Sequence, residues 1–216
     1  MYLEVFADNP FATNCWLLAL QDKEEAVVVD PGFSPDRVHD LLRAAGKRPV
    51  AVLATHGHFD HVGSAAQFCG DDIACYIHEE DRLALVDPVK WGSSFPVPAN
   101  PPSIVRTFVE GDLLELAGFS LRVMHTPGHT PGHCAFHFES HRVVFVGDLM
   151  CTWNPLSGRI GPQIMPAAFN VSSDQSLASL ERIEPLAATI VLPGHGEPWT
   201  QGVEAAVARA REAGKS

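Results

Sequence analysis

Residues 55–61 read Thr-His-Gly-His-Phe-Asp-His, and this stretch decides the interpretation of the whole chain. Four of its side chains can bind a metal ion: His56, His58, Asp60 and His61. Burying imidazoles and a carboxylate so close together is unfavourable unless a cation binds them. The apolar run Val50–Ala54 directly precedes the stretch and is typical of a buried strand. The pattern therefore predicts a metal site at the end of a strand.

Three later segments supply further ligands in similar surroundings. They are Thr126-Pro127-Gly128-His129-Thr130, Val146-Gly147-Asp148-Leu149 and Leu192-Pro193-Gly194-His195-Gly196. Each comes where an apolar strand pattern gives way to a loop. Strand ends on one side of a sheet can bring distant chain segments to one point, because the scaffold fixes their directions. We therefore expect these ligands to act with the first cluster.

Together, the four segments resemble the metallo-β-lactamase-fold hydrolases, and most closely the short glyoxalase II (hydroxyacylglutathione hydrolase)-like members. The resemblance is good across residues 15–65 and 120–150 and around residue 195, and poor across 87–104 and 152–175. It implies an α/β (α+β) fold, a four-layer αβ/βα sandwich of metallo-β-lactamase type. A single domain of this type is expected to span residues 1–216.

The resemblance also implies a ligand set for two divalent metal ions. One ion would be held by His56, His58 and His129, and the second by Asp60, His61 and His195. Asp148 would bridge both ions. Zinc is the first expectation, with iron or manganese as alternatives, because imidazole and carboxylate ligands suit all three metals.

A hydroxide bridging two such ions is a nucleophile at neutral pH, and the ions can polarise a carbonyl. The expected reaction is the hydrolysis of a thioester or ester, a small-molecule substrate. Asp60 is expected to orient the hydroxide or receive its proton, and the catalytic residues are predicted to be Asp60, His56 and His58.

Other branches of the family are open to different degrees. The β-lactam-hydrolysing branch generally lacks the bridging Asp, whereas Asp148 is present. A mononuclear-iron persulfide (sulfur) dioxygenase has closely similar motifs and is the main alternative, followed by a lactonase or a non-catalytic metal-binding protein. Only 21 residues follow His195, so we expect the binding residues of the helical extension with which full-length glyoxalase II enzymes bind glutathione to be absent.

Composition narrows the class of protein further. The chain has 216 residues, 46% of them hydrophobic, which fits one domain with a substantial core. A formal net charge of −11 disfavours nucleic acid as a partner. The five cysteines form no C-x-x-C pair, and the N-terminus has neither a basic segment nor a long apolar run. We therefore expect a cytoplasmic protein without membrane contact, as a monomer or homodimer.

Several other residues are secondary candidates. His125 and His133 flank His129 and can orient a ligand or be ordinary hydrogen-bonded residues. Asp30 matches a position that the family uses to hold a ligand histidine or the loop beneath the metals. Trp91 and Phe95 lie on the irregular segment 87–103, and Trp153 directly precedes the irregular segment 154–169. These side chains can wall a substrate pocket or simply pack the loops down, whereas Cys151 is expected to be a buried, unreactive thiol.

Overall fold

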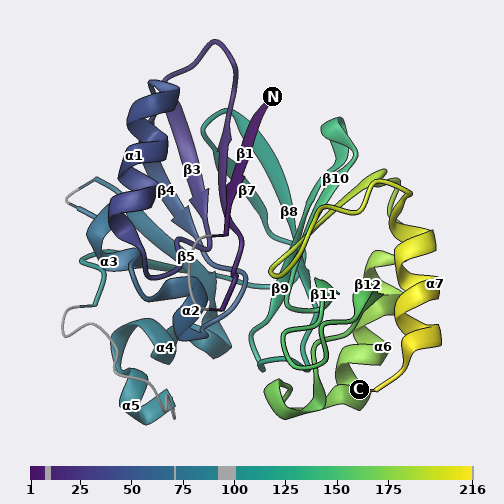
Figure 1. Ribbon diagram of the computed structural model, residues 1–216. Helices are drawn as coiled ribbons and strands as arrows, with labels where there is room; N and C mark the ends of the chain where they lie inside the picture. The colour runs from purple at the N-terminus through teal and green to yellow at the C-terminus, as the bar shows by residue number, and fades with distance from the viewer. Residues whose placement is uncertain (8–10, 71, 92–100, 216) are drawn as a thin grey trace. The chain divides into compact units, whose positions relative to one another are not determined.

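The computed structural model describes residues 1–7, 11–70, 72–91 and 101–215. The chain forms two compact units (Figure 1). The N-terminal unit comprises Met1–Phe108 with Glu115–Phe119, and the C-terminal unit comprises Val109–Leu114 with Ser120–Ser216. Each unit contains its own sheet and helices, so the predicted α/β class is confirmed. Phe95, a predicted pocket residue, lies outside the described residues, as does the middle of the predicted 87–103 loop.

The N-terminal unit is built on a six-stranded sheet with the order β1-β2-β3-β4-β5-β6. β2 runs antiparallel to both of its neighbours, β1 and β3, whereas β3, β4, β5 and β6 run parallel to one another. The strands are β1 (Tyr2–Phe6), β2 (Cys15–Ala19), β3 (Glu25–Val29), β4 (Arg48–Leu53), β5 (Ala74–His78) and β6 (Val105–Phe108).

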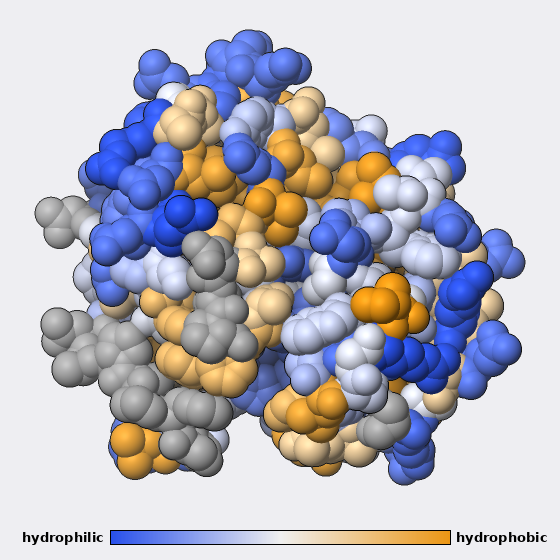
Figure 2. Space-filling view, viewed as in Figure 1, coloured by the Kyte–Doolittle hydropathy of each residue, from blue (hydrophilic) through white to orange (hydrophobic). Residues whose placement is uncertain are grey.

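Helices cover one face of this sheet. The helices are α1 (Pro35–Ala45), α2 (Phe59–Val62), α3 (Ala65–Phe68), α4 (Arg82–Val86) and α5 (Pro88–Trp91). Alternate strand residues such as Leu17, Val28 and Val52 pack with Val38 and Leu42 of α1 in one buried cluster. The opposite side of α1 is exposed, and hydrophilic residues dominate that region in Figure 2.

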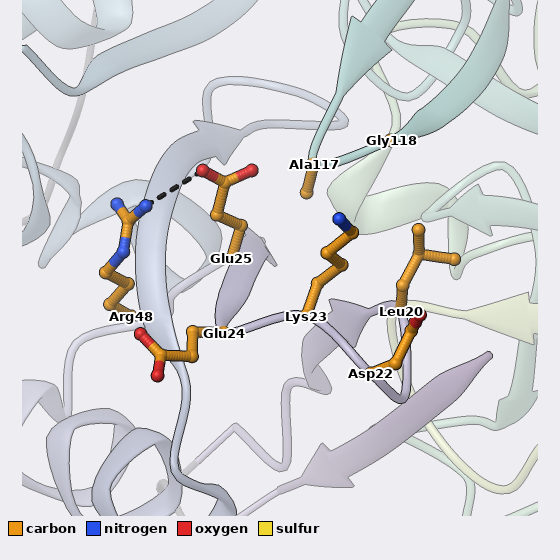
Figure 3. Close-up of a pocket in the computed structure, with 8 residues that line it drawn as sticks. All are labelled: Leu20, Asp22, Lys23, Glu24, Glu25, Arg48, Ala117 and Gly118. Carbon is orange, nitrogen blue, oxygen red and sulfur yellow. Dashed lines mark hydrogen bonds and ion pairs between the residues drawn. The ribbon is translucent and has the colours of Figure 1, made fainter.

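Charged residues surround a shallow hollow of about 460 Å³ at the turn between β2 and β3 (Figure 3). Arg48 and Glu25 form an ion pair of 2.8 Å beside it, and both side chains are largely exposed. Exposed pairs of this kind contribute about 0–1 kcal/mol. The hollow is therefore a solvated surface feature of the N-terminal unit.

The C-terminal unit has a five-stranded sheet with the order β13-β10-β9-β8-β7. β10 is parallel to β13 and antiparallel to β9, which is antiparallel to β8. The strands are β7 (Leu113–Leu116), β8 (Phe119–His125), β9 (Cys134–Phe138), β10 (Val143–Gly147) and β13 (Ile190–Pro193). A separate hairpin pairs β11 (Cys151–Trp153) with β12 (Ile160–Gln163).

The helices α6 (Ser173–Ile183) and α7 (Val203–Ala213) complete this unit. Leu180 and Ile183 of α6 and Val207 of α7 share a buried cluster with Val144 and Val191 of the sheet. Ser172 caps α6, since its hydroxyl accepts a hydrogen bond of 3.2 Å from the backbone N–H of Gln175. Of the described helices, none is long and apolar enough to cross a membrane.

The structure adds elements that the sequence pattern did not predict. β1 forms an edge of its sheet, α5 begins the predicted 87–103 loop, and β12 lies within the predicted irregular segment 154–169. β12 contains Gly161 and Pro162, which are residues that ordinarily interrupt strands. Of two short helices, α2 overlaps the end of the 55–61 stretch and α3 follows it.

Candidate metal centre

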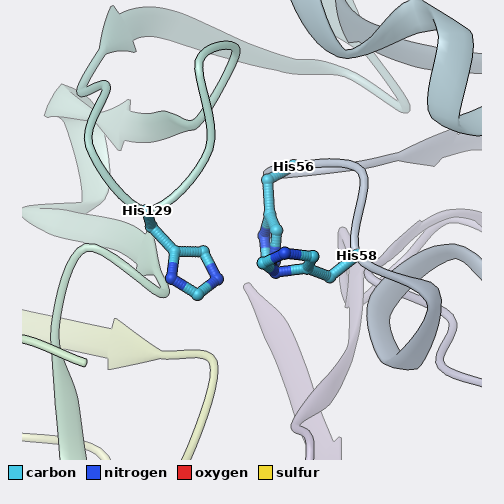
Figure 4. A group of neighbouring side chains, drawn as sticks. All are labelled: His56, His58 and His129. Atoms are coloured by element: carbon cyan, nitrogen blue, oxygen red, sulfur yellow. The ribbon is translucent and has the colours of Figure 1, made fainter. Parts of the chain in front are cut away.

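In the N-terminal unit, His56 and His58 stand on the loop that follows β4 (Figure 4). His56 Nε2 lies 3.0 Å from His58 Nδ1, and the two rings are perpendicular. The Thr55 hydroxyl lies 3.0 Å from His56 Nδ1 and 2.7 Å from Asp30 Oδ2. Because the hydroxyl has one proton and donates it to the carboxylate, it must accept the other hydrogen bond from His56 Nδ1–H. The unprotonated nitrogen of His56 is therefore Nε2, on the His58 side.

Asp30 fixes the second buried histidine of this loop in the same way. Its carboxylate accepts from the Thr55 backbone N–H at 2.8 Å and lies 3.0 Å from His61 Nδ1. His61 Nδ1 therefore carries a proton, and Nε2 faces Asp60 Oδ2 at 3.6 Å. Asp30 thus holds the ring of a predicted ligand histidine.

Two further contacts position the ligand loop. The Thr13 hydroxyl donates a hydrogen bond of 2.7 Å to Asp60 Oδ2. The buried carboxylate of Asp81 accepts one of 2.9 Å from the backbone N–H of Gly57. A Cβ added at Gly57 would lie 2.3 Å from Ala84 Cβ, so no larger residue fits between the two histidines without a shift of the loop.

In the C-terminal unit, Asp148 and His195 follow the ends of the adjacent parallel strands β10 and β13. His129 stands on the loop after β8 (Figure 4). All three side chains are buried. Asp148 Oδ2 lies 3.2 Å from His129 Nε2 and 3.3 Å from His195 Nε2. A single oxygen of the Asp148 carboxylate is therefore close to two imidazole nitrogens, one from His129 and one from His195.

These spacings fit metal ligands. Two ligand atoms at ~2.1 Å from one tetrahedral ion lie about 3.4 Å apart. The nitrogen–oxygen distances at Asp148 are 3.2 and 3.3 Å, and the nitrogen–nitrogen distance between His56 and His58 is 3.0 Å. The N-terminal unit thus brings together four of the predicted ligands, and the C-terminal unit brings together the other three.

His129 and Asp148 are each held by a neighbouring side chain. His129 Nδ1 lies 3.0 Å from Asn170 Oδ1. His133 Nε2 accepts the backbone N–H groups of Asp148 at 3.0 Å and Leu149 at 3.2 Å. His133 therefore orients the segment that carries a predicted ligand.

The sequence and structure of known proteins place the chain in a family. The profile of the metallo-beta-lactamase superfamily matches residues 8–195. The chain belongs to the metallo-beta-lactamase superfamily. Members of this superfamily are mostly metal-dependent hydrolases, so the predicted family and the general class of fold and chemistry are confirmed.

Two of the relatives of this chain have names that state an activity. The chain is 30% identical over 210 residues to the hydroxyacylglutathione hydrolase GloC of Haemophilus influenzae, covering 94% of this chain and 95% of that protein. It is 30% identical over 188 residues to the acyl-coenzyme A thioesterase MBLAC2 of Gallus gallus, covering 71% of this chain and 65% of that protein.

Two solved structures have the same fold. The B3 metallo-beta-lactamase BLEG-1 aligns with a TM-score of 0.78 at 29% identity, covering 94% of this chain and 96% of that one. TTHA1623 in a di-iron-bound form aligns with a TM-score of 0.69 at 32% identity, covering 95% and 97%. TTHA1623 is thus a protein of related sequence and the same fold that binds iron.

The surroundings of His125 and Cys151, two other residues singled out from the sequence, indicate a structural role for each. His125 Nε2 donates a hydrogen bond of 2.8 Å to the Pro131 carbonyl and so bridges its own loop. Burial raises the pKa of the Cys151 thiol far above its ordinary value, and the charge of Asp148 adds to this effect. Cys151 is therefore protonated at neutral pH, in agreement with an unreactive thiol.

The two tryptophans predicted to wall a pocket each contact a ligand segment of their own unit. Trp91 lies edge-on to His58 with ring centroids 5.5 Å apart. The backbone nitrogen of Trp153 lies 2.5 Å from the position that a Cβ on Gly196 would take. A pocket role for either ring stays a prediction.

Three residues of the site were not predicted from the sequence: Thr13, Asp81 and Asn170. Asp81 and Thr13 are single polar residues far along the chain from the ligands that they contact, and no spacing rule connects them. The signal for Asn170 was weak but present, since it precedes Ser172, the cap of α6. Residues just before a helix are fixed by the cap and can serve a site.

Proposed function

We propose that this chain is a dinuclear metal-dependent hydrolase that cleaves a thioester, or a related ester, of a small-molecule substrate. In this proposal, His56, His58 and His129 hold one ion, Asp60, His61 and His195 hold the second, and Asp148 is shared. Zinc is the proposed metal, with iron as the first alternative because TTHA1623 is di-iron-bound.

One observation supports the proposal above the others. Asp148 Oδ2 has two imidazole Nε2 atoms at 3.2 and 3.3 Å, which is the surrounding expected of a shared carboxylate ligand. His129 and Asp148 are 1% and 2% exposed, so a buried charge there needs a cation as partner. The thioester class is supported by GloC and MBLAC2, whose names both describe thioester hydrolysis.

The chain's own residues have distinct parts in this reaction. Divalent ions held by these ligands would lower the pKa of water toward neutrality and polarise the acyl carbonyl. Asp60 is held at Oδ2 by the Thr13 hydroxyl at 2.7 Å, and its carboxylate is proposed to orient the attacking water and receive its proton. Asp30 keeps the His61 ring in one tautomer, so the ligand is ready without reorganisation.

The test combines metal analysis with activity on one preparation. The purified protein is analysed for zinc, iron and manganese, and is assayed with a hydroxyacylglutathione and a panel of acyl-coenzyme A thioesters. About two zinc ions per chain with turnover is the expected result. His129→Ala is expected to abolish turnover while leaving the fold nearly unchanged, and His141→Ala, at a partly buried residue outside the ligand set, is the matched control.

Other outcomes identify the alternatives. One iron per chain, no hydrolysis and oxygen uptake with a persulfide would assign a dioxygenase. Hydrolysis of a lactone in preference to thioesters would assign a lactonase, and hydrolysis of a β-lactam would favour the activity for which BLEG-1 is named. Tight metal binding with no turnover on any of these substrates would indicate a metal-binding protein without catalysis.

A further inference from the structure

We infer that Asn170 is a positioning residue for the metal site, because its carboxamide holds the ring of His129 in the tautomer whose Nε2 can bind an ion. This inference rests on the proposed function in so far as His129 is a metal ligand. The assignment of Asn170 itself comes from hydrogen bonds within the C-terminal unit.

The orientation of the Asn170 carboxamide is fixed by its partners. Asn170 Nδ2 lies 2.8 Å from the Met165 carbonyl oxygen and 3.2 Å from Ser173 Oγ. A carbonyl oxygen only accepts hydrogen bonds, so the group facing Met165 must be the NH₂. The other atom of the carboxamide, Oδ1, therefore faces His129 Nδ1 at 3.0 Å.

The carboxamide oxygen determines where the imidazole carries its proton. Oδ1 has no hydrogen, so the hydrogen bond forms only when His129 carries its proton on Nδ1. A neutral ring protonated there has its lone pair on Nε2, which lies 3.2 Å from Asp148 Oδ2. The alternative tautomer would place two lone pairs against each other at Asn170 and a proton where an ion has to bind.

The backbone around Asn170 keeps the carboxamide in place. The Val171 N–H donates to the His129 carbonyl at 3.1 Å, and the Ser172 N–H donates to the Gly128 carbonyl at 2.8 Å. Gly128 has φ +135°, and a Cβ there would lie 2.3 Å from the backbone nitrogen of Ser176 in α6. The segment before α6 and the His129 loop are thus joined side by side, and Asn170 is only partly buried at the join.

The test uses two substitutions with opposite expectations. Asn170→Leu removes the acceptor for His129, whereas Asn170→Asp keeps an acceptor oxygen but places a second oxygen against the Met165 carbonyl. Zinc affinity is measured by competition with a chromophoric chelator. Asn170→Leu is expected to weaken it about 10–100-fold, and Asn170→Asp to keep it close to that of the parent.

Thermal stability of the zinc-free proteins separates positioning from simple structural support. Asn170→Asp is expected to melt below the parent because its carboxylate faces the Met165 carbonyl, and yet to bind zinc more tightly than Asn170→Leu. If Asn170 were only structural, zinc affinity would follow stability, so a loss of zinc affinity in Asn170→Asp in proportion to its loss of stability would overturn the inference. Ser173→Ala removes only the 3.2 Å contact to Asn170 and is the matched control, expected to bind zinc like the parent.

Nitrogen-15 NMR of the zinc-free protein reads the tautomer directly, with the His129 signal assigned by its absence in His129→Gln. We expect the proton on Nδ1 in the parent and a mixture of tautomers in Asn170→Leu. A proton on Nε2 in the parent would overturn the inference. If the parent bound no zinc, the proposed function would fail, while this readout would still decide the role of Asn170.

Discussion

Replacing His133 by leucine tests how the segment bearing Asp148 is held. His133 is fully buried, and its Nε2 accepts the N–H groups of Asp148 at 3.0 Å and Leu149 at 3.2 Å. Its Nδ1–H donates to the Thr126 hydroxyl at 2.9 Å. Leucine has a similar volume, so the change removes hydrogen bonds without opening a large cavity.

The magnitude follows from the acceptors that remain. Leu149 N–H keeps a second acceptor, the Val146 carbonyl at 3.1 Å, so its loss is small. The Asp148 N–H loses His133 Nε2 as its acceptor, which should lower stability by about 1–3 kcal/mol. The Thr126 hydroxyl loses its hydrogen bond from His133, which should lower stability further by about 0.5–1.5 kcal/mol. The expected total of about 1.5–4.5 kcal/mol corresponds to a fall in melting temperature of roughly 3–18 °C for a chain of this size.

The assay is thermal unfolding of the zinc-free protein, so that loss of metal binding does not contribute to the result. His133→Gln is the control, because its side-chain oxygen can replace Nε2 as an acceptor, and it is expected to recover part of the stability. A leucine variant that melts within about 1 °C of the parent would refute the reasoning, because the loss of a buried hydrogen bond should lower stability by more than that.

Three further predictions concern single positions. Gly128→Ala, whose Cβ would lie 2.3 Å from the backbone of α6, should lower melting temperature and zinc affinity together, whereas Gly158→Ala, with φ +71° and open space around it, should cost only about 1–2 kcal/mol of stability; equal effects would contradict this. Burial lowers the pKa of His137 below its ordinary 6.5, so the unfolded chain binds this proton more readily and stability should fall as pH falls below about 6.5. His137→Leu should flatten that part of the stability profile, and an unchanged profile would exclude the residue as its cause. A hydrogen bond from Cys75 lowers the pKa of the half-buried Cys69 thiol, so Cys69 should be the first cysteine that a thiol reagent modifies in the folded protein, as mass spectrometry of the labelled peptides would show.

Most of the fold could be predicted because its strands are continuous apolar runs. β2, β3 and β10 are buried along nearly their whole length, and such strands have a composition that loops lack. β1 lies at the edge of its sheet and is only partly buried, so its pattern was too weak to predict. The hairpin of β11 and β12 was hidden by the glycine and proline of β12.

Much of the candidate site was predictable for a different reason. Four ligand-type side chains within residues 56–61 are chemically improbable without a cation, so local sequence alone is informative. The groups that hold the ligands have no such density. Asp81 and Asn170 are common loop residues, and their roles arise only when the folded chain brings them to Gly57 and His129.

The residues that hold the predicted ligand histidines share one arrangement. Thr55, Asp30 and Asn170 each place an acceptor about 3.0 Å from a histidine Nδ1, at His56, His61 and His129 respectively. Each acceptor therefore leaves Nε2 as the nitrogen that can bind an ion, although the three acceptors come from separate segments of the chain. Because the tautomers are set before any ion arrives, binding need not reorganise the rings, and the free energy of binding is not reduced by that cost. Substitution of a ligand should then abolish binding at its ion, whereas substitution of a holding residue should weaken binding in proportion to the tautomer population lost.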